Sequence, residues 1–458
     1  IKAQPETLSA AMVVIDQEQW KSLPATIAIG RAYIAQSRGN TQDTIRYASQ
    51  VLELIPEGGS YRHSQAAMML GMTYWASGDL EAAGRVFADY TLKLRAAGNI
   101  PDAISTTVVL ADIKLALGRL REAINTIEKL LQFIMHQGEP IYPDIADLHR
   151  VLSELYLEQG NLEAAAQHLR RSKELGDKAE LPVWRYRWSI AQARLNETQG
   201  DLDGALALLY EAERQYIRTP LPDLCPISAM KARIWVAQDR LIEAQGWVRG
   251  QDLSVDDDLG YLCEFEYITL ARILIAQYHK DRMEDSIHSA LQLLDRLLQT
   301  ADECSRMGSV IEILVLKALA YQTQGSIPPA LAPLERALTL AEPEGYIRIF
   351  VDEGTPMATL LREASKHGIT PKYVSQLLTA FGKPEVKRPL TQSLIEPLSE
   401  RELEVLRLLR TDLNGPEIAR EFMVSLNTVR THTQNIYAKL GVNNRRAAVR
   451  RAEELDLF

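Results

Sequence analysis

The fold of the C-terminal part of this chain is decided by residues 398–442, which read LSERELEVLRLLRTDLNGPEIAREFMVSLNTVRTHTQNIYAKLGV. Two capping boxes set helix starts in this segment, because Ser399 and Asn414 are each followed three positions later by a glutamate. Ser425 stands where it would cap a third helix. The segment therefore predicts three short helices in succession.

The apolar residues of this segment predict a common core. They recur at helical spacing, and in chain order they are Leu403, Val405, Leu406, Leu409, Ile418, Ala419, Phe422, Val429, Ile436 and Leu440. The first helix is expected over 401–410, and Pro416 falls in the first turn of the second, where its missing N–H is not needed. Gly441 suits the end of the third helix, and Asn444 can cap a fourth over 445–454. The sequence thus predicts a small four-helix domain.

Several stretches of this domain follow one another in a familiar order. They are Leu398-Ser399-Glu400-Arg401-Glu402, Glu417-Ile418-Ala419, Thr428-Val429-Arg430-Thr431-His432 and Asn435-Ile436-Tyr437-Ala438-Lys439-Leu440-Gly441-Val442. In order and spacing they closely resemble the LuxR-type helix-turn-helix domain. Pro416 departs from that family, which usually carries lysine or another polar residue there, so one backbone phosphate contact is absent.

The resemblance implies a DNA-binding regulator of transcription. We expect the protein to bind double-stranded promoter DNA as a homodimer. We also expect it to activate transcription and to contact RNA polymerase. In this family the recognition helix lies in the major groove, where a few side chains read base edges. Carried onto this chain, the base-reading positions are Arg430, Thr431 and Gln434. The positions expected at phosphates are Asn427, Thr428, Lys439, Arg445 and Arg446.

The charges of the domain agree with a DNA-binding face. Residues 397–458 hold ten Lys or Arg and nine Asp or Glu, while the whole chain has a net charge of −9. The basic residues gather in 427–452, which contains no acidic residue. Such a run is commonly an ordinary solvated helix surface, but together with the motif it favours a phosphate-binding face. His432 fits a packed histidine better than a base reader.

An internal repeat organises the chain before this domain. The pattern Gly-x-Leu-x-x-Ala is strongest in four copies, which start at Gly78, Gly118, Gly160 and Gly200, at spacings of 40, 42 and 40 residues. Weaker copies, in chain order, start at Gly39, Asp239, Asp281 and Gly325. A period near 40 predicts an array of helix pairs, about eight here, in which each pair buries its apolar face against its neighbours.

Tyr74, Tyr156 and Tyr321 each stand four residues before a repeat glycine. Together with the glycine and the alanine of the motif, these tyrosines resemble the tetratricopeptide repeat (TPR), although the period exceeds the usual length of about 34 residues. The longer, irregular repeat is similar to that of MalT-like LuxR regulators, and residues 341–354 resemble the piece that ends the sensor in that family. The resemblance implies an array that senses a small-molecule or protein inducer and controls the DNA-binding domain. The alternative is a TPR-like interaction scaffold whose DNA-binding domain serves only for localisation.

These patterns divide an all-α chain into a TPR-like superhelical sensor over 1–381, a linker over 382–397 and the LuxR-type domain over 398–458. The linker is marked by three prolines and no apolar periodicity. MalT-like regulators carry a nucleotide-binding switch domain ahead of the repeats, yet this chain has no GxxxxGK(S/T) loop. Because the chain opens on Ile1 in what reads as a helical array, we expect an upstream ATP-binding switch domain to have been cut away. No cofactor is expected within the chain itself.

Composition and motifs argue against several other classes of protein. Cys225, Cys263 and Cys304 are isolated and odd in number, which predicts neither a zinc site nor a disulfide framework and fits a reducing cytoplasm. No apolar run approaches the roughly 18 residues needed to cross a bilayer. The sequence has no HExxH or GxSxG motif, so we expect neither an enzyme nor a metal site.

One aromatic and basic cluster in the array is a candidate ligand site. It is Trp184-Arg185-Tyr186-Arg187-Trp188, where ring faces and guanidinium groups could clasp a sugar or an anionic ligand. The alternative is ordinary packing between helices, which is the commoner use of such residues.

Overall fold

The computed structural model describes residues 17–55, 61–136, 142–179, 182–217, 222–382, 399–411, 413–422, 424–440 and single positions between 442 and 452. Regular structure in the described residues is helical, with no strand, so the predicted all-α fold is confirmed. The chain divides into two compact units, Ile1–Phe381 and Gly382–Phe458.

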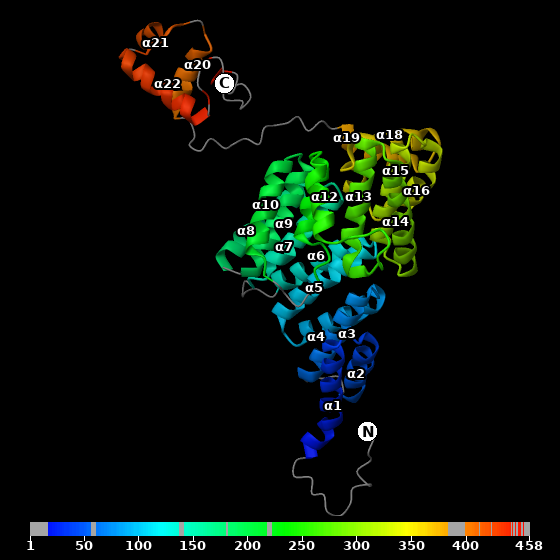
Figure 1. The fold of residues 1–458 in the computed structure, drawn as a ribbon. Coiled ribbons are helices and arrows are strands. Elements are labelled where there is room, and N and C mark those ends of the chain that lie inside the picture. The colour runs from blue at the N-terminus through cyan, green and yellow to red at the C-terminus, as the bar shows by residue number, and fades with distance from the viewer. Residues whose placement is uncertain are drawn as a thin grey trace, which may run out of the picture. The chain divides into compact units, whose positions relative to one another are not determined.

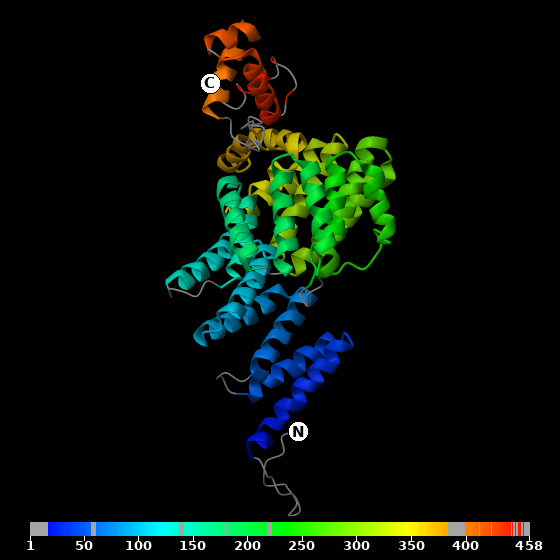
Figure 2. The same ribbon diagram turned by 90° about the vertical axis from the view of Figure 1, so that its left-hand side faces the viewer.

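The first unit consists of helix pairs that follow one another along an array (Figure 1, Figure 2). Pair by pair, the helices are α1 (Gln17–Ser37) with α2 (Thr41–Leu54), α3 (Tyr61–Ser77) with α4 (Leu80–Ala96), α5 (Ile100–Ala116) with α6 (Leu120–His136), α7 (Ile145–Glu158) with α8 (Leu162–Ala179), α9 (Pro182–Thr198) with α10 (Leu202–Gln215), α11 (Ile227–Ala237) with α12 (Leu241–Gly250), α13 (Glu264–Asp281) with α14 (Glu284–Glu303) and α15 (Met307–Thr323) with α16 (Ile327–Ala341). A short 3-10 turn, η2 (Tyr261–Cys263), precedes α13. The predicted array of helix pairs is confirmed.

The repeat glycine forms the turn inside each of the four strongest pairs. Gly78, Gly118, Gly160 and Gly200 have φ between 72° and 83°, in the left-handed region where a Cβ is unfavourable. In two of these copies the next residue is an aspartate, whose side chain accepts a hydrogen bond from the backbone N–H three residues on. The motif is therefore a turn followed by an N-cap.

The alanine of the motif lies where the helices approach each other closely. Ala83, Ala123, Ala165 and Ala205 are all 0% exposed. A larger side chain at these positions would collide with neighbouring helices, because protein interiors are close-packed. Apolar residues of α5 to α7 share one continuous core with those of α13 to α16. The first unit thus has contacts between repeats that lie far apart in sequence.

The segment after α16 packs back onto the array. It forms α17 (Arg348–Val351), α18 (Gly354–Lys366) and α19 (Pro371–Gly382). Phe350 is fully buried, and its ring meets the ring of Tyr373 edge-on with 6.1 Å between centroids. Residues 342–381 therefore belong to the first unit.

The second unit contains the predicted helix-turn-helix, formed by α20 (Glu400–Leu409), α21 (Gly415–Glu421) and α22 (Leu426–Leu440). Both capping boxes are present: Ser399 Oγ accepts from the N–H of Glu402 at 3.3 Å, and the side chain of Asn414 accepts from the N–H of Glu417 at 3.1 Å. Of the predicted fourth helix, positions 445, 448, 449 and 452 are described, and all four are helical. The predicted linker lies almost wholly outside the described residues.

Candidate DNA-binding surface

Helix α22 is held by its apolar side and by its cap. Val429 and Ile436 are 3% and 0% exposed, in the core shared with α20 and α21. Ser425 Oγ accepts a hydrogen bond from the N–H of Thr428 at 3.1 Å, which satisfies one of the donors left free at a helix N-terminus. These contacts fix the rotation of α22 about its axis, so the other side of the helix faces outward.

The outward side of α22 carries short polar side chains. Thr428, Thr431 and Gln434 are exposed, as expected for one phosphate contact and two base readers. The helix has 15 residues, which corresponds to about 22 Å at 1.5 Å per residue. An α-helix with its side chains is about 10–12 Å across, which fits a major groove about 12 Å wide. The side chains of three further predicted contacts lie outside the described residues: Asn427, Arg430 and Arg446.

Lys439 is engaged inside the domain. Its Nζ lies 2.8 Å from Oε2 of Glu402, which is 4% exposed. Burial acts to raise the pKa of Glu402, but the hydrogen bonds from Lys439 and Ser399 outweigh it and lower that pKa. The pair joins the end of α22 to the start of α20. Lys439 is therefore an anchor of the recognition helix, and we remove it from the expected phosphate contacts.

Arg445 has a structural role in place of the expected phosphate contact. Its guanidinium donates to the carbonyl oxygens of Leu409 at 2.8 Å and Leu413 at 2.6 Å, and also to those of Leu408 and Thr411. These carbonyls lie at and just after the C-terminal end of α20, where helices leave acceptors unsatisfied. Because a phosphate would have to displace these bonds, we correct the prediction for Arg445 to a helix C-cap.

Sequence reasoning missed these anchoring contacts for a physical reason. Glu402 is recognisable as the third residue of a capping box, but the box does not reveal its second partner. The acceptors of Arg445 lie 32 to 37 residues away in the chain, and no local pattern marks them. A third anchor is the guanidinium of Arg401, which lies 4.3 Å from the ring centroid of Phe422.

The geometry of the aromatic cluster in α9 favours packing over ligand binding. Trp184 is 4% exposed and donates from Nε1 to Ser172 Oγ at 3.1 Å. Tyr186 is 7% exposed. Trp188 donates from Nε1 to a backbone carbonyl of α8, and Arg187 pairs with an aspartate of α7 at 2.7 Å. Only Arg185 has an exposed side chain. The cluster joins α7, α8 and α9, and we do not propose it as a ligand site.

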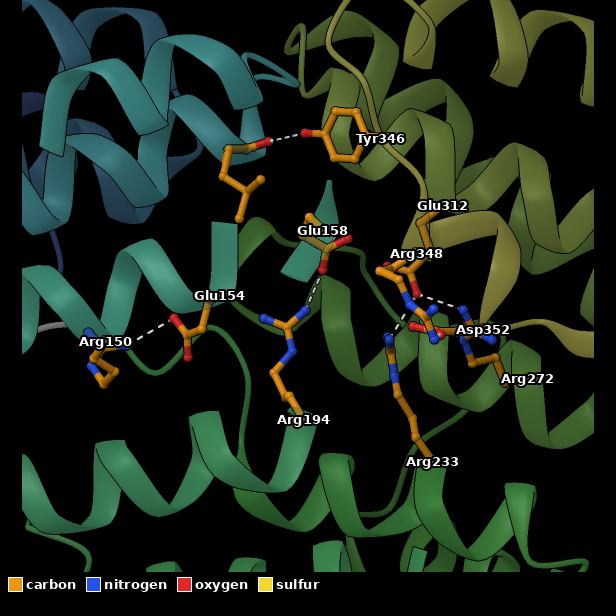
Figure 3. A network of polar contacts seen from close by, with 11 residues as sticks. Arg150, Glu154, Glu158, Arg194, Arg233, Arg272, Glu312, Tyr346, Arg348 and Asp352 are labelled. Atoms are coloured by element: carbon orange, nitrogen blue, oxygen red, sulfur yellow. Dashed lines mark hydrogen bonds and ion pairs between the residues drawn. The ribbon is translucent and has the colours of Figure 1, made fainter. Parts of the chain in front are cut away.

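A network of ion pairs lies inside the array (Figure 3). In six successive helix pairs, the first helix of the pair carries an ionisable residue at the same repeat position. These residues are spaced 39 to 42 positions apart and are Asp112, Glu154, Arg194, Arg233, Arg272 and Glu312. Arg233 and Arg272 reach Glu312 from neighbouring helices, at 2.8 and 3.0 Å. Arg272 also lies 2.7 Å from Glu353, just after α17. The network was missed in the sequence, although it shares the period of the repeat.

Burial and neighbouring arginines set the pKa values in this network. Burial acts to raise the pKa of Glu312, but Arg233 and Arg272 together lower it to about 2. Burial raises the pKa of Asp112 to about 7, although Arg150 opposes the shift. The network therefore ties successive repeats together by charge, and one of its carboxyl groups changes its charge near neutral pH.

The described residues contain no group of three or more His, Cys, Asp or Glu side chains arranged to hold a metal ion. Among the same residues, no helix has the length and apolar character that a membrane span requires.

Comparison with protein families agrees with both units. A helical-repeat array and a helix-turn-helix in one chain define a class of transcription regulators. The model of the MalT-like TPR region matches residues 25–367, and that of the luxR family of bacterial regulatory proteins matches residues 396–452. The chain belongs to the MalT-like regulators of transcription with a LuxR-type helix-turn-helix.

Two curated relatives of the chain are both named HTH-type transcriptional regulator MalT. The HTH-type transcriptional regulator MalT of Serratia proteamaculans (strain 568) is 24% identical over 470 residues, covering 95% of this chain and 50% of the relative. The HTH-type transcriptional regulator MalT of Yersinia pestis (strain Pestoides F) is 25% identical over 454 residues, covering 93% and 49%. The chain therefore spans about half the length of the curated relatives it matches.

Solved structures resemble the array loosely. A Rap protein complexed with competence and sporulation factor has 11% identity and a TM-score of 0.48, over 72% of this chain and 88% of that chain. A signal transduction ATPase with a tetratricopeptide repeat sensor from Pyrococcus horikoshii has 12% identity and a TM-score of 0.40, over 78% and 52%.

Proposed function

We propose that this chain binds double-stranded promoter DNA by placing α22 in the major groove, and that the array senses an inducer that controls this binding. The observation that carries the proposal is the outward polar side of α22. The three helices of the unit, each with an N-cap, share one core that holds α22 in this orientation. Thr431 and Gln434 lie on this side, and Arg430 shares it by helical spacing. An arginine can pair with guanine and a glutamine with adenine in the major groove.

The phosphate contacts that remain are Asn427, Thr428 and Arg446. We further propose activation of transcription in the cytoplasm, binding as a homodimer, and RNA polymerase as a partner, following the family. For the array we propose a small molecule or a protein as the inducer. A TPR-like scaffold with a DNA-binding domain used only for localisation is the second candidate.

Binding of labelled DNA duplexes to the full chain, followed by fluorescence anisotropy, tests the DNA-binding part. Arg430→Ala and Gln434→Ala should each weaken specific binding by about 1–3 kcal/mol while leaving the fold intact. Arg407→Ala is the matched control, because Arg407 is an exposed arginine that lies on α20 and not on α22. Equal losses on specific and random duplexes would argue against base reading.

The salt dependence of the same binding separates phosphate contacts from base contacts. Removing one phosphate contact with Arg446→Ala should lower the slope of log affinity against log salt by about 1 and weaken binding to all sequences alike. Gln434→Ala should leave that slope unchanged. The scaffold alternative predicts DNA binding that no ligand or partner of the array alters.

A further inference from the structure

Residues 342–353, here called the strap, connect the last helix pair to α18 and cross the ends of much earlier helices. The N–H of Ile347 donates to the carbonyl of Glu158 at 2.8 Å. The hydroxyl of Tyr346 donates to the carbonyl of Leu115 at 3.4 Å, as Figure 3 shows, and Arg348 donates to a carbonyl at the end of α9 at 3.4 Å. The acceptors lie in the last turns of α5, α7 and α9, where carbonyl groups have no partner four residues on within the helix. The carbonyl of Leu115 also accepts from the N–H of Gly118 at 2.9 Å.

The strap also supplies an N-cap that one repeat lacks. The residue after the repeat glycine is Asp79, Asn161 or Asp201 in three strong copies, and its side chain accepts a hydrogen bond from the N–H three residues on. The fourth strong copy has Arg119 at this position, which cannot accept such a bond. There the carboxylate of Glu344 accepts from the N–H of Arg121 at 3.0 Å, from 223 residues away. The departure from the repeat is thus matched by a residue of the strap.

Close packing shows that one repeat turn leaves room for the strap and another leaves room for α15. A Cβ at Gly160 would lie 3.0 Å from Ile347, and one at Gly118 would lie 2.8 Å from Met307 of α15. At Gly200 and Gly325 such an atom would meet nothing within 4 Å. The glycines of α5–α6 and α7–α8 therefore serve two purposes, a left-handed turn and room for a distant segment.

The two attachments of the strap differ in strength. Toward the late helices, Phe350 is 0% exposed and its ring meets the ring of Tyr373 of α19, so this side is held by a buried aromatic pair. Toward α5, α7 and α9 the contacts are single hydrogen bonds, two of them at 3.4 Å, and the packing of the Ile347 side chain against Gly160. The Nε of Arg348 is buried there without a partner among the described residues. A segment held by few polar bonds opens at lower free energy than a packed core.

We propose that the strap is a latch: in the closed state it adds a second connection between early and late repeats to the core that they share, and in an open state it leaves α5 to α9 while staying on α15, α18 and α19. The array would then have two states, which differ in whether the strap contacts the early repeats. Because the strap and α18–α19 are the covalent path from the repeats to the second unit, we propose that opening changes DNA binding. This last step rests on the DNA-binding function proposed above. An inducer of the array would act by binding one arrangement better than the other.

Hydrogen exchange on the full chain tests the latch. The amides of Ile347 and Arg121 should exchange faster than the amide of Leu316 in the core of α15. The variant Glu344→Ala/Ile347→Ala should speed both by about tenfold or more and leave Leu316 unchanged. Glu342→Ala is the matched control, because Glu342 is an exposed glutamate of the same segment. If Ile347 in the wild type exchanges as slowly as Leu316, opening requires global unfolding and the latch is overturned.

Anisotropy with a labelled duplex of random sequence tests the coupling to DNA. We expect the double variant to change the affinity by about fivefold or more, a typical coupling between sites, and Glu342→Ala to leave it as in the wild type. An unchanged affinity in a variant whose strap exchanges faster would overturn the coupling. If the wild type binds no DNA, the proposed function fails, while the exchange experiment still decides whether the latch exists.

Discussion

The helix-turn-helix unit and the helical array both use local N-caps, but the array also takes one N-cap from a distant segment. In the first, Ser399 and Asn414 cap α20 and α21 through partners three residues away. In the second, α6 receives its cap from Glu344, 223 residues further along the chain. The difference teaches that the N-caps of the DNA-binding unit are specified by local sequence, whereas one N-cap of the array needs a contact between distant repeats. A local N-cap can be recognised in the sequence, and a distant one cannot.

The largest effect on stability should come from a substitution in the core of the second unit. This substitution tests whether the two units unfold independently. Ile436 is 0% exposed at the centre of that core. Ile436→Ala should lower the free energy of unfolding of this unit by about 2–5 kcal/mol. In calorimetry of the full chain, the transition of the helix-turn-helix unit should move and that of the array should stay. A shift of both transitions would show that the units unfold together.

The buried pair of Glu402 and Lys439 tests how far the second unit depends on a contact outside its capping boxes. Glu402→Ala should destabilise the unit by about 3 kcal/mol or less, because it leaves the half-buried Lys439 without its carboxylate. The pKa of Glu402 is lowered on folding. Its contribution is therefore present above the unfolded pKa of about 4.3 and is lost as the pH falls through the lower folded pKa.

Denaturant unfolding monitored at several pH values measures this loss. Glu404→Ala is the control, since Glu404 is an exposed glutamate on the same helix whose ion pair with Arg401 is also exposed. It should cost about 0.5 kcal/mol or less. Equal effects of the two substitutions would mean that the pair adds nothing beyond a surface contact.

Much of the fold could be predicted from the sequence because its signals are local. The capping boxes, the turn glycines and the buried alanines all act within a few residues, and the structure confirms them. The roles of Arg445 and Glu344 could not be predicted, because each is set by carbonyls or amides that only the folded chain brings near. On α22 the sequence correctly placed Thr431 and Gln434 on the outward side. Whether they read bases remains a prediction.

The network of buried ion pairs in the array tests how far the array depends on contacts between repeats. The folded pKa of Asp112 is raised to about 7. The contribution of Asp112 to the stability of the array should therefore be most favourable below the unfolded pKa of about 3.9 and should fall as the pH rises to about 7. Asp112→Asn should remove this slope and stabilise the array at pH 8 by an amount on the order of 1 kcal/mol.

Thermal unfolding of the array at pH 5 and pH 8 measures the slope. Asp102→Asn, at an exposed aspartate of the same helix, should leave it in place. A wild-type array equally stable at both values would mean that Asp112 is ionised in the fold without penalty.

The smallest effect should come from the cap of the recognition helix. Ser425→Ala removes the acceptor for the N–H of Thr428 and should destabilise the second unit by about 1 kcal/mol. Ser425→Gly should cost only a few tenths of a kcal/mol. Chemical unfolding of the second unit distinguishes the two, and an alanine variant as stable as the wild type would show that the cap is dispensable.

Selection of DNA sequences from a random pool by the full chain tests the central claim most directly. The account predicts that the wild type enriches a defined sequence with two related half-sites, and that Gln434→Ala changes or relaxes the preference at one base pair in each half-site. Arg407→Ala should enrich the same sequence as the wild type. Failure of the wild type to enrich any sequence, or an enriched site that Gln434→Ala and Arg430→Ala leave unaltered, would contradict the assignment of α22 as the reading helix.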